Sequence, residues 1–503
     1  MDLLHNLYLG FSVAFLPVNL LFCFLGVFLG TLVGVLPGIG PGATIALLLP
    51  VTFNLPPETA IIMLAGIFYG VQYGGSTTSI LVNIPGEASS VVTCLDGYQM
   101  ARQGRAGPAL GISAFGSFIG GTLSIIGLMF MGPWLAGLAL RFGPPEYFSL
   151  MLLSMVILTF LSGESMVKSF LSALIGLFIG IIGMDPIYGV ERFSYGSFTL
   201  SDGVGLVPVA MGLFGIGEVL SSLEQKDVRD VFKTRIKGLL PTLRDWKESI
   251  GAIIRGSFIG FLLGILPGGG VIMSTFTSYA LEKRISPHPE TFGKGAIAGV
   301  AGPETANNAA STSCMIPLLS LGIPSNVIMA LLLGAMMIHG ITPSSFLMTE
   351  HPQVFWGVVT SMYVGNIFLL ILNVPLIGLW VRVLKIPYGI LFPLILLFCL
   401  IGVYTVNGDS YEILIMLIFG ALGYLMRKTG FEPAPMLFAM VIGPIMENAL
   451  RRSLLHSRGH FSIFVTHPIS AVLIGISCLL LLTQLLPKVR RKRDKIVQEE
   501  GCD

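Results

Sequence analysis

The sequence predicts an all-α protein that crosses a membrane many times. Of its 503 residues, 53% are hydrophobic and only 11% are charged, whereas a soluble domain carries about 25% charged residues. The mean hydropathy is +0.84. Apolar runs long enough to span about 30 Å of hydrocarbon recur at 20–36, 112–131, 354–384 and 465–486. We therefore predict about ten to fourteen spanning helices rather than the short alternating strands of a membrane barrel.

The first notable element, residues 30–51, is apolar but interrupted in its middle. It reads GTLVGVLPGIGPGATIALLLPV, and the interruption consists of Pro37, Gly38, Gly40, Pro41 and Gly42. Proline and glycine weaken or break helices, and free backbone inside a membrane is tolerated only where protein or a cavity surrounds it. We expect a discontinuous or re-entrant helix whose free N–H groups attract anions and whose free carbonyl groups attract cations.

The same interruption recurs in the second half of the chain. Residues 260–270 read GFLLGILPGGG and match GTLVGVLPGIG at 30–40, with Pro267 lying 230 positions after Pro37. Each copy is followed by small polar residues, an apolar stretch and an Ile-Pro pair. Duplicated halves that each contain a broken helix are typical of secondary transporters with a site near the bilayer midplane. We therefore predict two inverted-topology repeats.

Glycines and prolines near the breaks have two interpretations. Gly26, Gly30 and Gly34 recur every four positions, which is more typical of close helix packing than of ligand contact. Recurrence in both halves favours instead a site-lining role for the Pro-Gly pairs at 37–38 and 267–268.

Two polar clusters follow the breaks. One contains Ser76, Thr77, Thr78 and Ser79, and the other contains Asn307, Asn308, Ser311, Thr312 and Ser313. A single Ser or Thr usually bonds a carbonyl of its own helix, but four in succession exceed that need, and asparagine is costly in lipid without partners. We expect a shared cavity with a bound solute. For Glu87 and Glu304 two interpretations stay open: each either lines this site or lies at an interface.

Basic residues collect in two stretches that define the domain organisation. A linker at 224–248 separates a first transmembrane repeat, 1–223, from a second, 249–486, and a basic tail occupies 487–503. The positive-inside rule places both stretches in the cytoplasm. Nucleic-acid binding is the alternative for the tail, but a basic run directly after a span is more typical of topology. The N-terminus lacks a signal peptide's features, so we expect it to be retained.

The sequence lacks the residues that several other chemistries require. The six cysteines are scattered without ligand spacing, so we expect buried thiols and no metal site beyond a transported Na⁺. An ATP-binding P-loop is absent, and residues 38–43 fit a dinucleotide motif without the strand that it requires. Intramembrane enzymes need placed nucleophiles, paired carboxylates or metal ligands. An enzyme and a passive channel are the alternatives to a transporter, and neither requires duplicated broken helices.

Eight segments, in order over nearly the whole chain, carry a family resemblance: GVLPGIGPG (34–42), YGVQYGGSTTSILVNIPGEASS (69–90), IGMDPIYGVERFSYG (182–196), GLFGIGEVL (212–220), GILPGGG (264–270), GPETANNAASTS (302–313), FGALGYLMRKTGFEPAPM (419–436) and GPIMENALRRSL (443–454). The chain resembles the large transmembrane subunit of the tripartite tricarboxylate transporters. The resemblance implies a bacterial inner-membrane importer of organic carboxylates. Its implied partners are a small four-helix membrane subunit and a periplasmic solute-binding protein, and the implied movement is of the elevator type.

The resemblance also assigns site residues in both halves. Those of the first half are Gly38, Gly40, Ser76, Thr77, Asn83, Pro85 and Gly86. Those of the second half are Gly268, Gly270, Asn307, Asn308, Ser311, Thr312, Pro324 and Ser325.

The charge of the expected substrate bears on energy coupling. The polar clusters hold no Lys or Arg, and two half-helix N-termini supply only about one unit of positive charge. Moving an anion inward opposes the membrane potential by about 2.3 kcal/mol per charge per 100 mV. We therefore expect cation symport without a further cofactor. Na⁺ is the first candidate because carbonyl and hydroxyl oxygens suit a hard cation, and H⁺ is the alternative.

Overall fold

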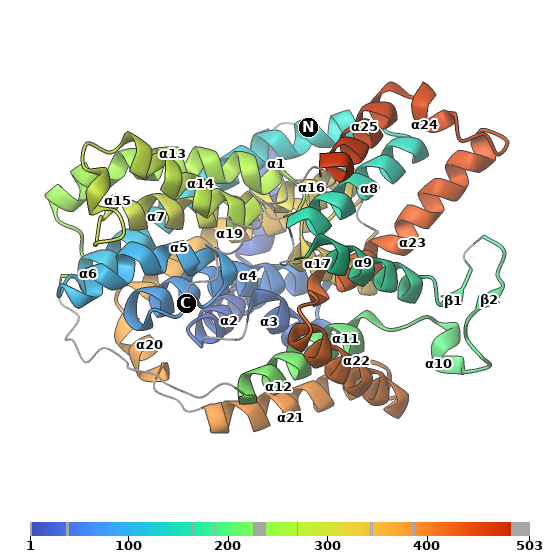
Figure 1. Cartoon of the computed structure of the whole chain (residues 1–503), viewed down its shortest axis with the longest axis horizontal. Coiled ribbons are helices and arrows are strands. Elements are labelled where there is room, and N and C mark those ends of the chain that lie inside the picture. The colour runs from blue at the N-terminus through green and yellow to red at the C-terminus, as the bar shows by residue number, and fades with distance from the viewer. Residues whose placement is uncertain are drawn as a thin grey trace.

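The computed structural model describes residues 3–36, 40–161, 165–185, 187–224, 238–268, 270–342, 344, 346–384 and 388–483. Within these ranges the regular secondary structure is helical apart from one hairpin of two short strands, β1 (Gly183–Met184) and β2 (Glu191–Arg192). Figure 1 shows long helices side by side, with the hairpin projecting from one end.

Helices of the first half are α1 (Leu3–Ala14), α2 (Pro17–Gly34), α3 (Pro41–Leu48), α4 (Pro57–Val82), α5 (Val91–Thr93), α6 (Gln99–Arg102), α7 (Ala106–Ala139), α8 (Pro144–Leu161), α9 (Met166–Gly180), α10 (Phe198–Ser201), α11 (Leu206–Ala210) and α12 (Gly217–Glu224). Short 3₁₀ or π segments extend or connect them: η1 (Leu49–Thr52), η2 (Ala88–Ser90), η3 (Cys94–Tyr98) and η4 (Met211–Ile216).

Helices of the second half are α13 (Leu243–Ile265), α14 (Gly270–Ile285), α15 (Ala298–Ser313), α16 (Met315–Leu321), α17 (Val327–Ile338), α18 (Leu347–Glu350), α19 (Pro352–Asn373), α20 (Ile377–Val383), α21 (Tyr388–Asn407), α22 (Ser410–Lys428), α23 (Pro433–His456), α24 (Ile463–Thr466) and α25 (Pro468–Thr483). The 3₁₀ segment η5 (Pro289–Thr291) precedes α15. Proline opens many helices of both halves, because its missing N–H and fixed φ suit the first helical position.

Eight helices among the described residues are long and apolar enough to cross a membrane, and six shorter apolar helices accompany them. The prediction of an all-α polytopic membrane protein is therefore confirmed. The eight are fewer than the predicted spans, partly because α4 is not among them although it is 26 residues long. Glycine, serine and threonine lower its hydropathy, yet every residue from 59 to 82 is buried.

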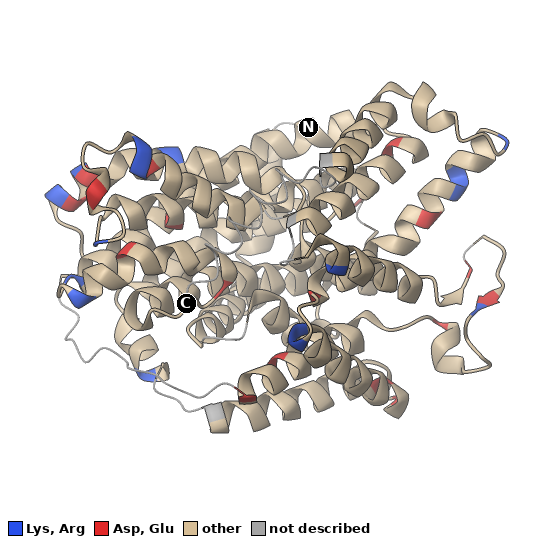
Figure 2. Cartoon of the chain, viewed as in Figure 1, with Lys and Arg blue, Asp and Glu red and all other residues tan. Residues whose placement is uncertain are grey.

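Two predicted runs are interrupted. The run at 354–384 divides into α19 and α20 around Pro375, and the run at 465–486 begins in α24 and continues in α25 from Pro468. Proline cannot donate the backbone hydrogen bond that a continuing helix requires. Figure 2 shows charged residues gathered at the left end of the view, around α6 and the loop before α15, with long uncharged stretches of helix beyond them.

The first predicted break lies between α2 and α3. α2 ends at Gly34, and the chain resumes at Gly40, whose extended backbone (φ −70°, ψ 171°) precedes Pro41 at the start of α3. Pro37 and Gly38, which the sequence singled out, lie outside the described residues.

The second break, between α13 and α14, reverses the chain. α13 ends at Ile265, and Gly268 has a φ of +113°, in the region that favours glycine. A Cβ on Gly270 would lie 2.3 Å from the Leu263 carbonyl oxygen. The start of α14 therefore packs against the last turn of α13, and the two helices form a hairpin.

Glycine stripes pack α2 against α4 and α13 against α15 in the same register. Cβ atoms on Gly26, Gly30 and Gly34 would lie 2.3, 2.3 and 2.4 Å from the carbonyl oxygens of Met63, Ile67 and Val71. Cβ atoms on Gly256, Gly260 and Gly264 would lie 2.5, 2.3 and 2.5 Å from those of Gly302, Ala306 and Ala310. The packing interpretation of these glycines is confirmed. The glycines recur 230 positions on and their partners 239 positions on, so the same helix pair is built twice.

Candidate functional site

Polar side chains from both halves meet in the interior at what we call the central polar cluster. They come from α4, the loop after it, α5, α7 and α15, and all are buried: Gln72, Ser76, Glu87, Ser89, Thr93, Ser113, Ser117, Glu304, Asn307 and Asn308. Since buried polar groups are costly unless they are hydrogen-bonded, their contacts decide what the cluster can do.

Glu304 of α15 accepts three hydroxyl hydrogen bonds from the first half. Ser76 and Thr93 each donate to it, and the Ser113 hydroxyl lies 3.1 Å from its Oε2. Three donors compensate a carboxylate charge in the absence of a cation. These contacts also fasten α15 to α4, α5 and α7.

Glu87, in the loop after α4, makes a second set of contacts with α15. Its Oε1 accepts from Asn307 Nδ2 at 3.0 Å and contacts the Ser89 hydroxyl. That hydroxyl also lies 2.9 Å from Asn307 Oδ1. Asn308 turns the other way, and its Nδ2 donates to Ser117 Oγ on α7 at 2.7 Å.

The structure brings three predicted site residues, Ser76, Asn307 and Asn308, into this cluster. Ser311 instead donates to the Asn307 carbonyl of its own helix at 2.9 Å. Thr77 and Thr312 are buried, and within the described part of the chain neither hydroxyl has a hydrogen-bond partner. These two hydroxyls are available to a solute or ion.

Predicted residues of the first loop lie at the end of α4. Asn83 is exposed and left-handed, with φ +59°, and Gly322 at the equivalent place in the second half has φ +69°. Pro85 is partly buried. A Cβ on Gly86 would lie 2.4 Å from Gly75 Cα and 2.6 Å from the Gly34 carbonyl oxygen, so the loop packs against the broken end of α2.

Predicted residues of the second loop contact the second break. The Gly268 N–H donates to the Ser325 carbonyl at 2.6 Å, and the Ser325 hydroxyl donates to the Cys314 carbonyl at 3.1 Å. Pro324 beside it is buried. Gly270 packs against α13, and Gly40 at the first break has nothing within 4 Å of where a Cβ would lie. Gly38 lies outside the described residues.

Several cluster residues were not among the predicted site residues. Glu87 and Glu304 were left open, and Gln72, Ser89, Thr93, Ser113 and Ser117 were missed. Ser113 and Ser117 carry a sequence signal, because residues four apart share one face of a helix. The others could not be found, since only the tertiary fold brings them to α15.

Asp96 of η3 makes another link between the halves. Its Oδ1 accepts from the backbone N–H groups of Gly293, Gly295 and Ala296 at 2.9, 2.7 and 2.8 Å. Tyr279 donates to its Oδ2 at 3.0 Å. One buried carboxylate therefore holds the loop that leads into α15.

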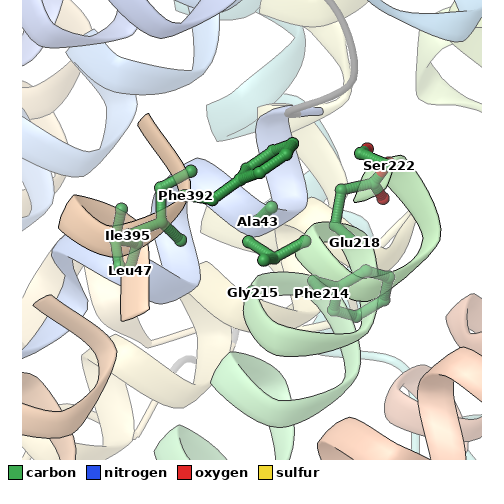
Figure 3. Close-up of a pocket in the computed structure, with 9 residues that line it drawn as sticks. Ala43, Leu47, Phe214, Gly215, Glu218, Ser222, Phe392 and Ile395 are labelled. Atoms are coloured by element: carbon green, nitrogen blue, oxygen red, sulfur yellow. The ribbon is translucent and has the colours of Figure 1, made fainter. Parts of the chain in front are cut away.

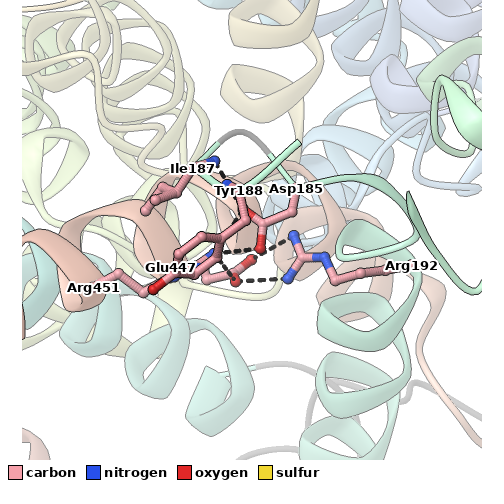
Figure 4. A network of polar contacts seen from close by, with 6 residues as sticks. All are labelled: Asp185, Ile187, Tyr188, Arg192, Glu447 and Arg451. Carbon is pink, nitrogen blue, oxygen red and sulfur yellow. Dashed lines mark hydrogen bonds and ion pairs between the residues drawn. The ribbon is translucent and has the colours of Figure 1, made fainter. Parts of the chain in front are cut away.

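The β1–β2 hairpin is fastened to α23 by the charged network in Figure 4. Arg451 donates to both carboxylate oxygens of Asp185, at 2.9 and 2.8 Å, and Arg192 binds Glu447 through two contacts of 2.7 and 3.2 Å. Desolvation opposes ionisation of Asp185. The Ile187 N–H, Arg451 and the Tyr188 N–H outweigh it and lower the pKa of Asp185 to about 2.

Two cavities lined by described residues lie outside the cluster. The one in Figure 3, beside Ala43, Phe214 and Glu218, has a volume of about 10 Å³, which is room for about one water. The other has about 460 Å³ and is lined by Phe142, Gly143, Pro144, Tyr147, Met337, Pro444, Ile445, Asn448, Ala449 and Arg452. Its size falls within the range of about 300–1,000 Å³ that small-molecule sites occupy, and Arg452 supplies a positive charge.

No group of three His, Cys, Asp or Glu side chains among the described residues is placed to hold a metal ion. His456 and His460 are four apart in the sequence, but α23 ends at His456 and both side chains are exposed. Cys23, Cys314 and Cys399 are buried as expected, Cys94 is partly buried, and Cys478 is exposed.

Comparisons with known proteins show the family of this chain. A family model described as the tripartite tricarboxylate transporter TctA family matches residues 20–438. A protein of Agrobacterium vitis, named only as an uncharacterized 52.8 kDa protein in the TAR-I ttuC' 3'region, is 49% identical over 500 residues, which is 99% of this chain and 100% of the relative. An uncharacterized protein in the TAR-II ttuC' 3'region of the same organism is 49% identical over 241 residues, 48% of this chain and 100% of the relative. No solved structure matches the chain.

Proposed function

This chain belongs to the tripartite tricarboxylate transporter TctA family, and from that premise we propose a specific function for it. It is the large membrane subunit of a binding-protein-dependent secondary transporter that imports organic di- or tricarboxylates by cation symport. Its partners are a small four-helix membrane subunit and a periplasmic solute-binding protein, and it works in a bacterial inner membrane. The family and the spanning helices already make it a multi-pass membrane protein of a transporter family.

The central polar cluster is the observation that carries this proposal. It joins the two halves of the chain through Ser76 with Glu304 and Ser89 with Asn307, in the interior of an otherwise apolar bundle. Ionisable groups inside membrane proteins are costly and mark solute and ion pathways. The hydroxyls of Thr77 in α4 and Thr312 in α15 offer further oxygen ligands on the two polar helices.

The cavity of about 460 Å³ supports a carboxylate as the substrate. Arg452 and Asn448 line it, and arginine is well suited to bind a carboxylate through two parallel hydrogen bonds. We propose that it receives the substrate before it reaches the cluster.

The repeated helix pairs support an inverted-repeat transporter. Gly30 against Ile67 and Gly260 against Ala306 are equivalent contacts in the two halves. Two equivalent bodies around a shared site can exchange conformations and expose that site to either side in turn. We propose an elevator-type movement of one body against the other.

Na⁺ is our first proposed coupling ion and H⁺ the second. Hydroxyl, amide and carboxylate oxygens dominate the cluster, and Na⁺ prefers such hard ligands. Uptake that follows a pH gradient and ignores a sodium gradient would reverse this order.

Uptake of labelled citrate by proteoliposomes that contain both membrane subunits and the binding protein tests the function. Replacing Asn307 and Asn308 together by alanine should abolish uptake while the protein remains folded in the membrane. Asn373→Ala is the matched control, because Asn373 is a buried asparagine that bonds the Leu369 carbonyl of its own helix at 2.9 Å. Unchanged uptake by the double variant would remove these residues from the site.

Counterflow exchange tests the channel alternative. A carrier exchanges labelled external citrate for unlabelled internal citrate faster than it takes up citrate into empty vesicles, whereas a pore gives no such stimulation. Absence of stimulation would favour the channel.

A further inference from the structure

Three side chains in the central polar cluster form a closed ring of hydrogen-bond contacts. Ser89 Oγ contacts Glu87 Oε1 and lies 2.9 Å from Asn307 Oδ1, while Asn307 Nδ2 lies 3.0 Å from the same Glu87 oxygen. All three residues are buried. Each of the three contacts requires one proton between its two heavy atoms.

The ring is one proton short if Glu87 is ionised. Serine has one hydroxyl proton, and an ionised carboxylate has none. With Asn307 as placed, its amide fills the contact to Glu87, and the Ser89 proton can fill only one of the two that remain. With the Asn307 amide turned over, its oxygen faces Glu87 and that contact is empty instead. In both orientations two acceptors face each other.

Gln72 does not supply the missing proton. Its side-chain oxygen lies 3.2 Å from Ser89 Oγ. If the Gln72 amide were turned over, its nitrogen would donate to the serine oxygen, and the number of protons available to the ring contacts of Glu87 would stay the same. The carboxyl group of Glu87 is the member of the ring that can gain a proton.

Glu304 provides a comparison within the same cluster. Ser76, Thr93 and Ser113 can each donate their hydroxyl proton to it. The other acceptor near Ser76 is the Gln72 carbonyl of the α4 backbone at 3.1 Å, so the contacts of Glu304 itself are complete when it is ionised. Two carboxyl groups in different surroundings can therefore differ in protonation.

The charged and titratable groups around Glu87 agree with a neutral carboxyl. The negative charge of an ionised Glu304, on α15, disfavours a second negative charge on Glu87. From the neighbouring helices, Tyr73 of α4 donates to Asn366 and Tyr279 of α14 donates to Asp96. Among the described residues, the recorded hydrogen bonds and ion pairs of Glu87 include no Lys, Arg or His.

We infer that Glu87 binds a proton in this conformation and releases it when the loop after α4 separates from Asn307. The O–H bond of the carboxyl group then breaks, and the proton passes to water on the side to which the site has opened. This inference rests on the proposed transport function for its role in a cycle, and it leaves room for Na⁺ elsewhere. Glu87 would thus make transport respond to a proton gradient.

Infrared difference spectroscopy of the purified full-length chain tests the proton without any transport assay. As the pH is raised, we expect loss of the carbonyl band of a buried protonated carboxyl group. Glu87→Gln should lack this band, while Glu248→Gln, which changes an exposed glutamate of α13, should keep it. A band that persists in Glu87→Gln would overturn the inference.

Ser89→Ala provides a second variant in case Glu87→Gln does not fold. Without the serine hydroxyl, the Asn307 amide alone satisfies the contact with Glu87, and no proton is missing. The pH at which the band is lost should then differ from that of the unchanged chain, and an unchanged titration would contradict the inference.

Proteoliposomes with labelled citrate and an internal pH-sensitive dye test the role in transport. Glu87→Gln should lose proton entry during uptake, because its amide cannot release a proton. Proton entry equal to that of the unchanged chain would overturn the inference. If the unchanged chain transports no carboxylate, the proposed function fails. The infrared result still shows whether Glu87 binds a proton.

Discussion

Asp96 and Asp185 each fasten a segment to an element that lies far away in the sequence. Asp96 holds the loop before α15 through three backbone N–H groups, and Asp185 holds the hairpin to α23 through Arg451. Backbone N–H groups that lose their partner in a buried place cost about 1–3 kcal/mol each. Single carboxylates can therefore decide whether a segment stays ordered.

Replacing Asp96 by alanine should destabilise the protein by about 1–3 kcal/mol, because the partly buried N–H groups of Gly295 and Ala296 lose their acceptor while the exposed N–H of Gly293 can turn to water. Thermal unfolding in detergent measures this loss. Asp96→Asn is the control, because its amide oxygen still accepts from the loop and its amide nitrogen can donate to Tyr279. Equal melting temperatures for Asp96→Ala and the unchanged chain would show that the loop has other anchors.

Acid should release the hairpin. The pKa of Asp185 is lowered from 3.8 to about 2 in the folded protein, so its ion pair contributes stability above pH 3.8 that is lost as the pH falls through about 2. Pepsin, which acts in acid, should cut the hairpin increasingly over this interval. Asp185→Asn should be cut already at pH 4. Equal cutting of the unchanged chain at both ends of the interval would contradict this anchor.

At the scale of helices, close packing through glycine determines the architecture. α2 and α13 approach their partners so closely that a single methyl group would meet a backbone carbonyl oxygen. Such contacts replace the hydrophobic effect, which does not drive association between helices in lipid. Each helix pair therefore depends on a few small residues.

Gly30→Ala and Gly260→Ala should both destabilise the protein, because each new Cβ would lie 2.3 Å from a backbone oxygen of the partner helix. Overpacking of this kind costs about 1–3 kcal/mol, and thermal unfolding measures it. Gly137→Ala in α7 is the matched control, since nothing lies within 4 Å of its Cβ position. A loss in only one of the two variants would show that the pairs are not equivalent.

Across the whole molecule, the two halves of the sequence share one interior. α7 of the first half packs against α13, α15 and α16 of the second, and Arg105 pairs with Asp245 at 3.1 Å. The boundary at 224–248 thus divides the sequence while the helices interleave. A site formed between interleaved halves can respond to the movement of either one.

The sidedness of the protein gives a prediction at this scale. One candidate span, Leu206–Glu224, separates the hairpin from the basic linker, so the two should lie on opposite sides, with the linker in the cytoplasm. In a chain without native cysteines, Tyr195→Cys should react with an impermeant maleimide in intact cells. Lys247→Cys should react only after permeabilisation. The reverse pattern would invert the topology.

Sequence alone determined the class of the protein and the places where its helices break. Long apolar runs predicted a membrane bundle because hydrocarbon excludes charge, and the Leu-Pro-Gly segments predicted ends that α2, α13 and α14 confirm. The sequence also predicted the polar clusters of α4 and α15, because Ser76 and Asn307 lie in otherwise apolar segments. Inverted topology and the elevator movement stay predictions.

Only the tertiary structure decided which polar groups meet. Glu87 and Glu304 were ambiguous in the sequence, because a carboxylate at a surface and one in a buried network look alike along the chain. Ser89 and Asn307 are more than two hundred residues apart, yet they share a hydrogen bond. Local patterns arise from the backbone and from burial, which each segment encodes by itself, whereas a network between segments depends on the packing of them all.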